Sequence, residues 1–223
     1  MSSSSGLVVG GVTERRKGRT GGPLVVLEGT NAVGKSSVAS DLAERLQAQA
    51  FHFPPAFVTF REEVGLDARV APIPRLVYYL GGILHLSSLI GEAMTAGPVV
   101  CDRYAASPIG AVIADGEPPE EEVLSLFSAF EPYIARPDLT ILLRCDHANA
   151  RARLEARSRR EGSLNVLHMR SLESPAYFRR THEAIRRQVY RMGPVVEIDT
   201  SSRTVEETRE AAWRVVRSQV QQA

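Results

Sequence analysis

Residues 24–37 read Leu-Val-Val-Leu-Glu-Gly-Thr-Asn-Ala-Val-Gly-Lys-Ser-Ser, and this stretch decides the fold of the chain. Its apolar start, Leu24–Leu27, predicts a buried strand, and the rest completes the phosphate-binding pattern G-x-x-x-x-G-K-[ST]. The glycines allow backbone N–H groups to turn toward phosphate oxygens, and the helix expected from Lys35 adds the positive end of its dipole. The stretch therefore predicts a loop that binds a nucleoside triphosphate.

The residues of this loop are the expected contacts of ATP. They are Gly29, Asn31, Ala32, Val33, Gly34, Lys35, Ser36 and Ser37. Lys35 would place its charge on the β- and γ-phosphates as a catalytic residue, and the Ser36 hydroxyl would ligate Mg²⁺. ATP and Mg²⁺ are therefore the expected cofactors.

The size and charge of the chain fit one enzyme domain. A chain of 223 residues with a formal net charge of +1 is long enough for one α/β domain with a full core. The near-neutral charge gives no reason to expect nucleic acid or a membrane surface as a partner. The two cysteines, Cys101 and Cys145, accompany apolar runs, so we expect small buried thiols rather than a disulfide or a metal site.

Residues 1–22 differ in composition from the rest. They are rich in Ser, Gly and Arg and lack the apolar core of a signal peptide, so we expect a mobile N-terminal tail before a domain at residues 23–223. We find no apolar run long enough to cross a bilayer. These features favour a cytoplasmic protein.

From Pro23 onward, apolar strand-like runs alternate with helical stretches. The expected strands are Leu24–Leu27, Ala56–Phe60, Val99–Cys101, Leu139–Leu143 and Val195–Ile198. The expected helices cover residues 35–49, 74–96, 119–135, 147–160, 173–191 and 204–221. This alternation predicts an α/β protein with a five-stranded parallel sheet flanked by helices. A phosphate loop after the first strand makes it a P-loop kinase fold.

The strand Val99–Cys101 ends in Asp102, Arg103 and Tyr104. Because the carboxyl ends of parallel strands border the ligand crevice, we expect these side chains to face the phosphates. Asp102 would hold Mg²⁺ through water, Arg103 would steady the acceptor or the moving phosphoryl group, and Tyr104 would contact the acceptor. The alternative is an ordinary salt bridge at a strand end.

Five arginines lie between Arg151 and Arg160, after the strand Leu139–Leu143. An arginine-rich lid would neutralise charge on the transferred phosphoryl group and exclude water. Arg153 and Arg157 are four residues apart and share a helix face, so we expect these two to be the catalytic arginines of the lid. The alternative is a solvated helix face paired with neighbouring glutamates.

Phe60–Glu63 closes the second expected strand and again borders the crevice. Arg61 would bind an acceptor phosphate, and Glu62 or Glu63 would accept a proton from an acceptor hydroxyl. The alternative is an ordinary polar loop. Aromatic residues would form a wall of the acceptor pocket, although such residues more often belong to a core. They are Tyr78, Tyr79, Phe51 and Phe53.

Taken in order, these motifs resemble those of the thymidylate kinase family. The family has a strand leading into Glu-Gly and a phosphate loop, then Arg-Glu-Pro, Asp-Arg-Tyr, Pro-Asp-Leu-Thr, an arginine-rich lid and a final Val-x-x-Ile-Asp strand. The matching segments here are Glu28–Ser36, Arg61–Glu63, Asp102–Tyr104, Pro137–Thr140, residues 151–160 and Val195–Asp199. The resemblance covers nearly the whole folded chain, and it implies a kinase that forms a homodimer through helices, with residues 74–96 as the main contributor.

The sequence departs from the family where the acceptor would bind. In the phosphate loop, Asn31 and Ala32 replace a charged residue and a glycine, and the sequence of this loop is closer to that of deoxynucleoside kinases. The arginine that contacts the nucleotide in thymidylate kinases corresponds to Gly82 by spacing, and the proline of Arg-Glu-Pro is absent. The resemblance thus implies intact donor machinery and a rebuilt thymidylate pocket.

Three functions follow from these observations. The first is an ATP-dependent phosphotransferase that acts on a nucleotide or nucleotide-like acceptor other than dTMP. The second is a small-molecule kinase that phosphorylates a hydroxyl of a nucleoside, aminoglycoside or secondary metabolite, with Glu62 or Asp102 as the base. The third is a nucleotide-binding regulator without transfer activity, which would have no need of a lid.

Overall fold

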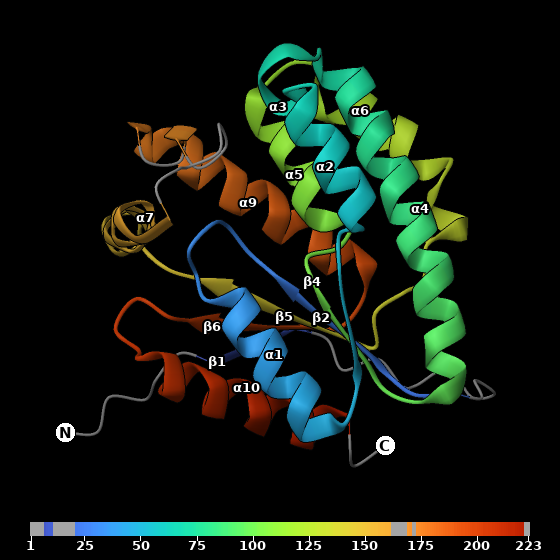
Figure 1. Ribbon diagram of the computed structural model, residues 1–223, viewed down its shortest axis with the longest axis vertical. Coiled ribbons are helices and arrows are strands. Elements are labelled where there is room, and N and C mark those ends of the chain that lie inside the picture. The colour runs from blue at the N-terminus through green and yellow to red at the C-terminus, as the bar shows by residue number, and fades with distance from the viewer. Residues whose placement is uncertain (1–6, 11–20, 162–168, 171–172, 221–223) are drawn as a thin grey trace.

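The computed structural model describes residues 7–10, 21–161, 169–170 and 173–220 as a six-stranded sheet with helices on both faces (Figure 1). The strands lie in the order β1-β6-β5-β2-β4-β3. Their bounds are Leu7–Gly10 for β1, Leu24–Glu28 for β2, Gln49–His52 for β3, Val99–Asp102 for β4, Leu139–Arg144 for β5 and Val195–Asp199 for β6. The strands β6, β5, β2, β4 and β3 pair in parallel, which confirms the predicted five-stranded parallel sheet.

A sixth strand joins this sheet at its edge. Residues 7–10 form β1, which pairs antiparallel with β6 and matches Leu7 to Ile198. These four residues belong to the segment expected to be a mobile tail. In contrast to that expectation, they form a strand at the edge of the sheet. Residues 1–6 and 11–20 lie outside the described part of the chain.

The helices are placed as follows in the chain. Their bounds are Lys35–Leu46 for α1, Pro55–Glu63 for α2, Leu66–Arg69 for α3, Pro72–Ala96 for α4, Ala106–Asp115 for α5, Glu120–Ser128 for α6, His147–Glu161 for α7, Pro175–Met192 for α9 and Val205–Gln219 for α10. A short 3₁₀ turn, Glu131–Tyr133, follows α6 and interrupts the helix expected over 119–135. The helices α5 and α3 were not foreseen.

Alternate residues of β2 pack into two separate hydrophobic cores, one on each face of the sheet. Val25 and Leu27 face α1 and α10, whereas Leu24 and Val26 face the layer of α4, α5 and α9. Figure 1 shows α1 and α10 below the sheet and the other helices above it. All five residues of β2 are buried, as expected for a central strand covered on both faces. The sheet is therefore rigid at the strand after which the phosphate loop begins.

The strand expected at Ala56–Phe60 is wrong. These residues form α2, and the edge strand β3 is Gln49–His52. The run Ala-Phe-Val-Thr-Phe looks strand-like because of its β-branched and aromatic residues, but Pro54 and Pro55 precede it, and proline fits the first turn of a helix. Arg61 and Glu62 consequently lie on a helix rather than at a strand end.

Helix α4 ends at Gly97-Pro98, as predicted, and is the longest helix among the described residues. By length and mean hydropathy it is the one described helix that could cross a membrane, but half of its most apolar window is buried within the protein. Leu76, Leu80 and Ile83 on this helix are fully buried, so α4 serves as a core helix here. Both cysteines are free thiols, and burial raises the pKa of each.

Close packing of α5 on α9 requires a glycine at position 110. A Cβ there would lie 2.8 Å from the backbone nitrogen of Ile185 and 3.1 Å from its Cα. We expect Gly110→Ala to lower the free energy of unfolding by about 1–3 kcal/mol, because the two helices would be forced apart. Denaturant unfolding of the purified variant measures this change.

Gly91→Ala is the matched control for this substitution. Gly91 is also helical, but a Cβ at this position would meet no atom within 4 Å. The control should be unchanged or stabilised by about 0.5–1 kcal/mol, since alanine is the better helix former. Equal stability of both variants would show that α5 and α9 pack less closely than the structure indicates.

Candidate active site

The phosphate loop joins β2 to α1 and has the backbone that its sequence predicts. Gly29 has a φ of +136°, and a Cβ there would lie 2.1 Å from the carbonyl oxygen of Leu143, so no other residue fits. Gly34, with a φ of +96°, precedes the first turn of α1, which has no side-chain cap. The first N–H groups of α1 are therefore open to an anion from the loop side. Ala32 also adopts a left-handed conformation, with a φ of +60°.

Lys35 is a buried cation at the start of α1. Its ammonium group donates a hydrogen bond to the carbonyl oxygen of Thr30, across the loop. Burial lowers the pKa of Lys35 well below its usual value, and the charge of Arg103 lowers it further, while Asp102 opposes this shift. No carboxylate of the described residues forms an ion pair with this buried charge, so an anion in the loop would stabilise it.

Arg103 lies against the phosphate loop, as predicted. Its guanidinium donates to the side-chain oxygen of Asn31 at 2.6 Å, to the hydroxyl of Ser107 at 3.0 Å and to the carbonyl oxygen of Gly29 at 3.3 Å. The backbone of Arg103 is left-handed, with a φ of +69°, which costs of order 1 kcal/mol in a residue other than glycine. A strained backbone that aims a cation at a phosphate loop is typical of a functional site.

Glu28 holds this arrangement together, and we had assigned it no role. It is 1% exposed at the end of β2, where it accepts hydrogen bonds from the backbone N–H groups of Tyr104 and Ser107 and from the Ser107 hydroxyl. The segment after β4 is thereby fixed to the end of β2. A glutamate directly before the first glycine of the loop is the signal that could have identified it.

The site has the features that Mg²⁺ and a nucleoside triphosphate need. Asp102 ends β4 with a buried carboxylate oxygen, and neither this oxygen nor the buried hydroxyl of Thr30 has a hydrogen-bond partner among the described residues. The Ser36 hydroxyl is exposed on the first turn of α1. The described residues contain no cluster of three or more His, Cys, Asp or Glu that would hold a metal alone. This suits Mg²⁺, which is bound by few protein groups together with phosphates.

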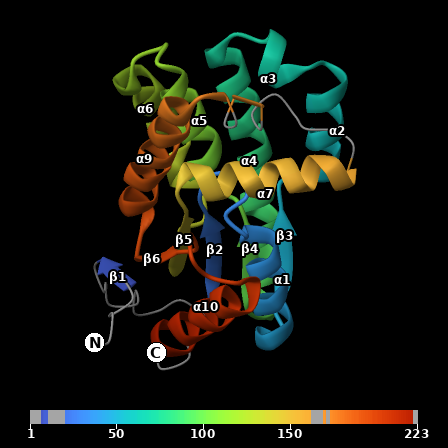
Figure 2. The same cartoon turned by 90° about the vertical axis from the view of Figure 1, so that its left-hand side faces the viewer.

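The arginine-rich lid begins with α7, which crosses the protein above the phosphate loop (Figure 2). Arg153 donates to the carbonyl oxygen of Ala32 at 3.3 Å and to Thr200, at 3.1 Å to its hydroxyl and 2.6 Å to its carbonyl. Arg151 forms an ion pair with Glu155 at 2.7 Å, the alternative that we had considered for part of this helix. Arg157 is exposed on the same helix. Residues 162–168 and 171–172, which follow the predicted lid segment 151–160, lie outside the described part of the chain.

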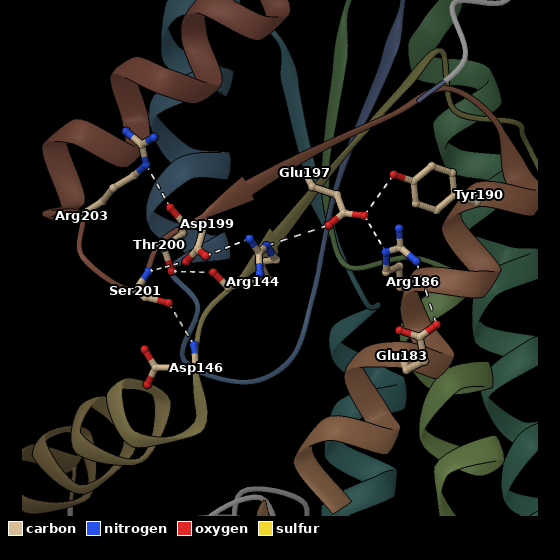
Figure 3. A network of polar contacts seen from close by, with 10 residues as sticks. All are labelled: Arg144, Asp146, Glu183, Arg186, Tyr190, Glu197, Asp199, Thr200, Ser201 and Arg203. Carbon is tan, nitrogen blue, oxygen red and sulfur yellow. Dashed lines mark hydrogen bonds and ion pairs between the residues drawn. The ribbon is translucent and has the colours of Figure 1, made fainter. Parts of the chain in front are cut away.

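Thr200, the partner of Arg153, is fixed by a polar network at the carboxyl ends of β5 and β6 (Figure 3). Its hydroxyl and its N–H both donate to the carbonyl oxygen of Arg144. Arg144 in turn forms an ion pair with Asp199 at 3.0 Å. Arg153 therefore connects the phosphate loop to a rigid turn between β6 and α10.

A cavity of about 180 Å³ lies beside the phosphate loop. Of the residues expected at the site, Asn31, Arg61, Arg103 and Tyr104 line it. Phe53 and Tyr79, two of the aromatic residues considered for the pocket wall, also line it. The charged lining residues that the sequence did not indicate are Asp67 and Arg75. Arg75 is 5% exposed within the apolar helix α4 and pairs with Asp115. A lone arginine on the apolar face of a helix was the available signal for it.

Two residues expected beside the acceptor, Glu62 and Tyr78, do not line this cavity. Glu62 is exposed on α2 and pairs with Arg61 at 3.3 Å, so it lacks the position expected of a general base. Its placement follows from the misplaced second strand. Tyr78 lies on the expected helix but donates to the carbonyl oxygen of Phe57 at 2.6 Å, while its neighbour Tyr79 lines the cavity.

The fold and the site define an ATP-dependent kinase of the P-loop class. The sequence profile of thymidylate kinase matches residues 27–212. The thymidylate kinase of Bdellovibrio bacteriovorus is 30% identical over 145 residues, which are 60% of this chain and 67% of that protein. The chain belongs to the thymidylate kinase family.

Solved structures agree on the fold. The thymidylate kinase of Candida albicans superimposes with a TM-score of 0.66 at 17% identity, covering 89% of this chain and 92% of that one. The deoxyadenosine kinase of M. mycoides gives a TM-score of 0.64 at 16% identity, covering 87% and 99%. The phosphate loop and the predicted parallel sheet are thus set in an established kinase fold.

Two arginines of α7 provide a direct test of the lid. We expect Arg153→Ala to raise the KM for ATP and to lower kcat/KM by roughly tenfold or more, since a contact with a charged group is worth about 1.5–3 kcal/mol. Arg151→Ala, two residues away, should stay within about twofold of the wild type, because its ion pair is exposed. Steady-state kinetics with varied ATP compares them. Equal losses in both variants would contradict a specific role of Arg153.

Proposed function

We propose that this protein is a nucleoside monophosphate kinase, which moves the γ-phosphate of Mg-ATP to a nucleotide or nucleotide-like acceptor, with dTMP not the preferred one. The observation that carries the proposal is the charge of the cavity beside the phosphate loop. Arg61, Arg75 and Arg103 line it, against one carboxylate, Asp67, among the described lining residues. A surplus of guanidinium groups suits an acceptor that carries a phosphate.

The chemistry needs charge stabilisation more than proton transfer. A phosphate oxygen of the acceptor would attack the γ-phosphorus while the bond to the bridging oxygen of ADP breaks and ADP takes the negative charge. An ionised acceptor phosphate needs no general base, which agrees with the position of Glu62 outside the cavity.

The residues have separate parts in this reaction. Lys35 would bind the β- and γ-phosphates, and Arg103 would place the acceptor phosphate against the transferred group. Asp102 and Ser36 would hold the Mg²⁺ that neutralises the phosphates of ATP. Arg153 and Arg157 would close the lid over the donor and exclude water.

The preference against dTMP rests on Gly82. The curated relatives carry the name thymidylate kinase, so dTMP is the first acceptor to test. At Gly82, however, a Cβ would lie 2.4 Å from the ring of Phe53 and 3.0 Å from that of Phe57. The position at which the family carries an arginine is thus covered by aromatic rings, which supports a different acceptor.

The remaining properties follow from this function. We propose a cytoplasmic enzyme that forms a homodimer through α4, where Val77 is 45% exposed on the side of the helix away from the core. Nucleic acid and membranes are not expected as partners, given the net charge of +1. Sedimentation velocity of the purified protein measures the dimer directly.

An ADP-release assay tests the transfer reaction. With Mg-ATP, we expect turnover with a panel of nucleoside monophosphates and none with nucleosides or aminoglycosides. Turnover confined to the hydroxyl compounds would refute a monophosphate kinase and support a small-molecule kinase. Absence of turnover with every acceptor, despite ATP binding, would favour a regulator.

Lys35→Met ties this activity to the phosphate loop. The substitution keeps the length of the buried stem and removes the charge, so we expect turnover to fall by roughly a thousandfold or more. Thermal unfolding should show a folded variant, because an unpaired buried charge has been removed. Retained activity in the folded variant would refute the assigned role of Lys35.

A further inference from the structure

The end of the cavity away from the phosphate loop is built by three residues from three elements. Phe53 follows β3, Asp67 lies on α3 and Tyr79 lies on α4. Thr30, Asn31 and Arg103 line the opposite end, at the loop. Figure 1 shows α3 and the start of α4 at the top of the protein, away from the turn between β2 and α1. An acceptor whose phosphate meets Arg103 would therefore direct its other end toward Asp67.

The polar groups at this far end are the Asp67 carboxylate, the Tyr79 hydroxyl and the guanidinium groups of Arg61 and Arg75. The hydroxyl of Tyr79 donates its proton to Oδ1 of Asp67 at 2.6 Å. Burial, and after it the charge of Asp67, raises the pKa of Tyr79, so the phenol keeps this proton at any physiological pH. A carboxylate has about four lone-pair positions, so Asp67 retains acceptor capacity toward the cavity.

The neighbouring cations are already engaged. One Nη of Arg75 donates to the carbonyl oxygen of Asp67 at 3.3 Å, and the other pairs with Asp115. Arg61 has its Nε 3.9 Å from Oδ2 of Asp67 and its Nη2 on Glu62. The guanidinium groups of these two arginines offset the negative charge of Asp67, but they do not occupy all of its lone pairs. A ligand at this end therefore meets a carboxylate that can accept further hydrogen bonds.

Aromatic rings complete the pocket around this carboxylate. The ring of Phe53 lies 5.5 Å from that of Tyr79 and is seated on Gly82, where any side chain would displace it. Phe57 packs edge-on against Phe53 at 5.8 Å and supports it. A flat ring would fit against such a wall, with its polar edge facing Asp67.

From this geometry we propose that Asp67 determines acceptor specificity by binding the exocyclic amino group of the acceptor's nucleobase. The proposal rests on the proposed monophosphate kinase activity and names its substrate class, which is a nucleoside monophosphate with an amino-bearing base. Cytosine, adenine and guanine each offer an amino donor, whereas thymine and uracil have keto oxygens instead. The single ring N–H of thymine or uracil is flanked by keto oxygens, so a carboxylate at this edge would also face a keto oxygen without a proton between them, and an unmade buried hydrogen bond is costly.

Competing acceptors test this proposal. We expect kcat/KM for at least one of dCMP, dAMP and dGMP to exceed the values for dTMP and dUMP by roughly a hundredfold, as for a site built to hydrogen-bond a substrate group. In Asp67→Asn, the amide also offers N–H donors, which can bind a keto oxygen. The ratio of kcat/KM between amino-bearing and keto-bearing acceptors should therefore fall about tenfold or more, toward unity. The ratio between acceptors is the readout, because a merely structural loss would lower all values together.

Glu92→Gln is the matched control, since it makes the same carboxylate-to-amide change on the exposed side of α4. It should leave the ratio unchanged. A wild-type preference for dTMP or dUMP would overturn the assignment of Asp67, and a preference for dTMP would also overturn the proposed preference against it. Either result would leave the monophosphate kinase reaction standing, even if Asp67→Asn failed to fold. An unchanged ratio in folded Asp67→Asn would also overturn it. Turnover of aminoglycosides or nucleosides alone would overturn both proposals.

Discussion

The buried carboxylate of Glu28 joins the ends of β2 and β4, which also pair through their backbones. It accepts from the backbone of Tyr104 and Ser107, so the segment after β4 cannot move away from the phosphate loop. Arg103 lies within this fixed segment and contacts Gly29 and Asn31 in return. A charge removed from water at 1% exposure is stabilised only by such complete hydrogen bonding. The position of Arg103, the proposed catalytic cation, therefore depends on a side chain to which we assign no part in the reaction.

The same principle of fixed charge in a dry environment governs the donor side. Lys35 is buried, Asp102 has an unpaired buried oxygen, and Arg153 is oriented by Thr200. Such groups need little reorganisation when phosphate charge develops between them, which is the largest source of rate enhancement in phosphoryl transfer. The acceptor side differs, since its charges are partly paired with one another, as Arg75 is with Asp115. Donor binding thus depends on charge, and acceptor choice depends on shape and hydrogen bonds.

The donor half could be predicted from the sequence because its signals are local. The apolar run of β2, the spacing of Gly29 and Gly34 and the start of α1 at Lys35 all lie within fourteen consecutive residues. The same holds for β4 and the residues that follow it. The lid helix could be placed from its arginines, although only a three-dimensional structure distinguishes Arg153 from Arg151 by its contacts.

The acceptor half could not be predicted in the same way. The edge strand β3 is short and largely exposed, so its pattern is weak, whereas the residues of α2 mimic a strand. Asp67 and Tyr79 are twelve residues apart on different helices, and their hydrogen bond depends on how α3 and α4 pack. Gly82 was identified as a departure from the family, but that Phe53 covers it is a tertiary contact that no local pattern contains.

Helix α2, which carries Arg61 and supports the aromatic wall, contains no buried residue. Its side chains therefore contribute little to the free energy of folding, whereas those of β2 and α4 form the core. Substitutions on α2 can change what the cavity accepts while the protein keeps its stability. The architecture thus separates the buried parts that stabilise the fold from a surface helix beside the cavity, where substitutions cost little stability.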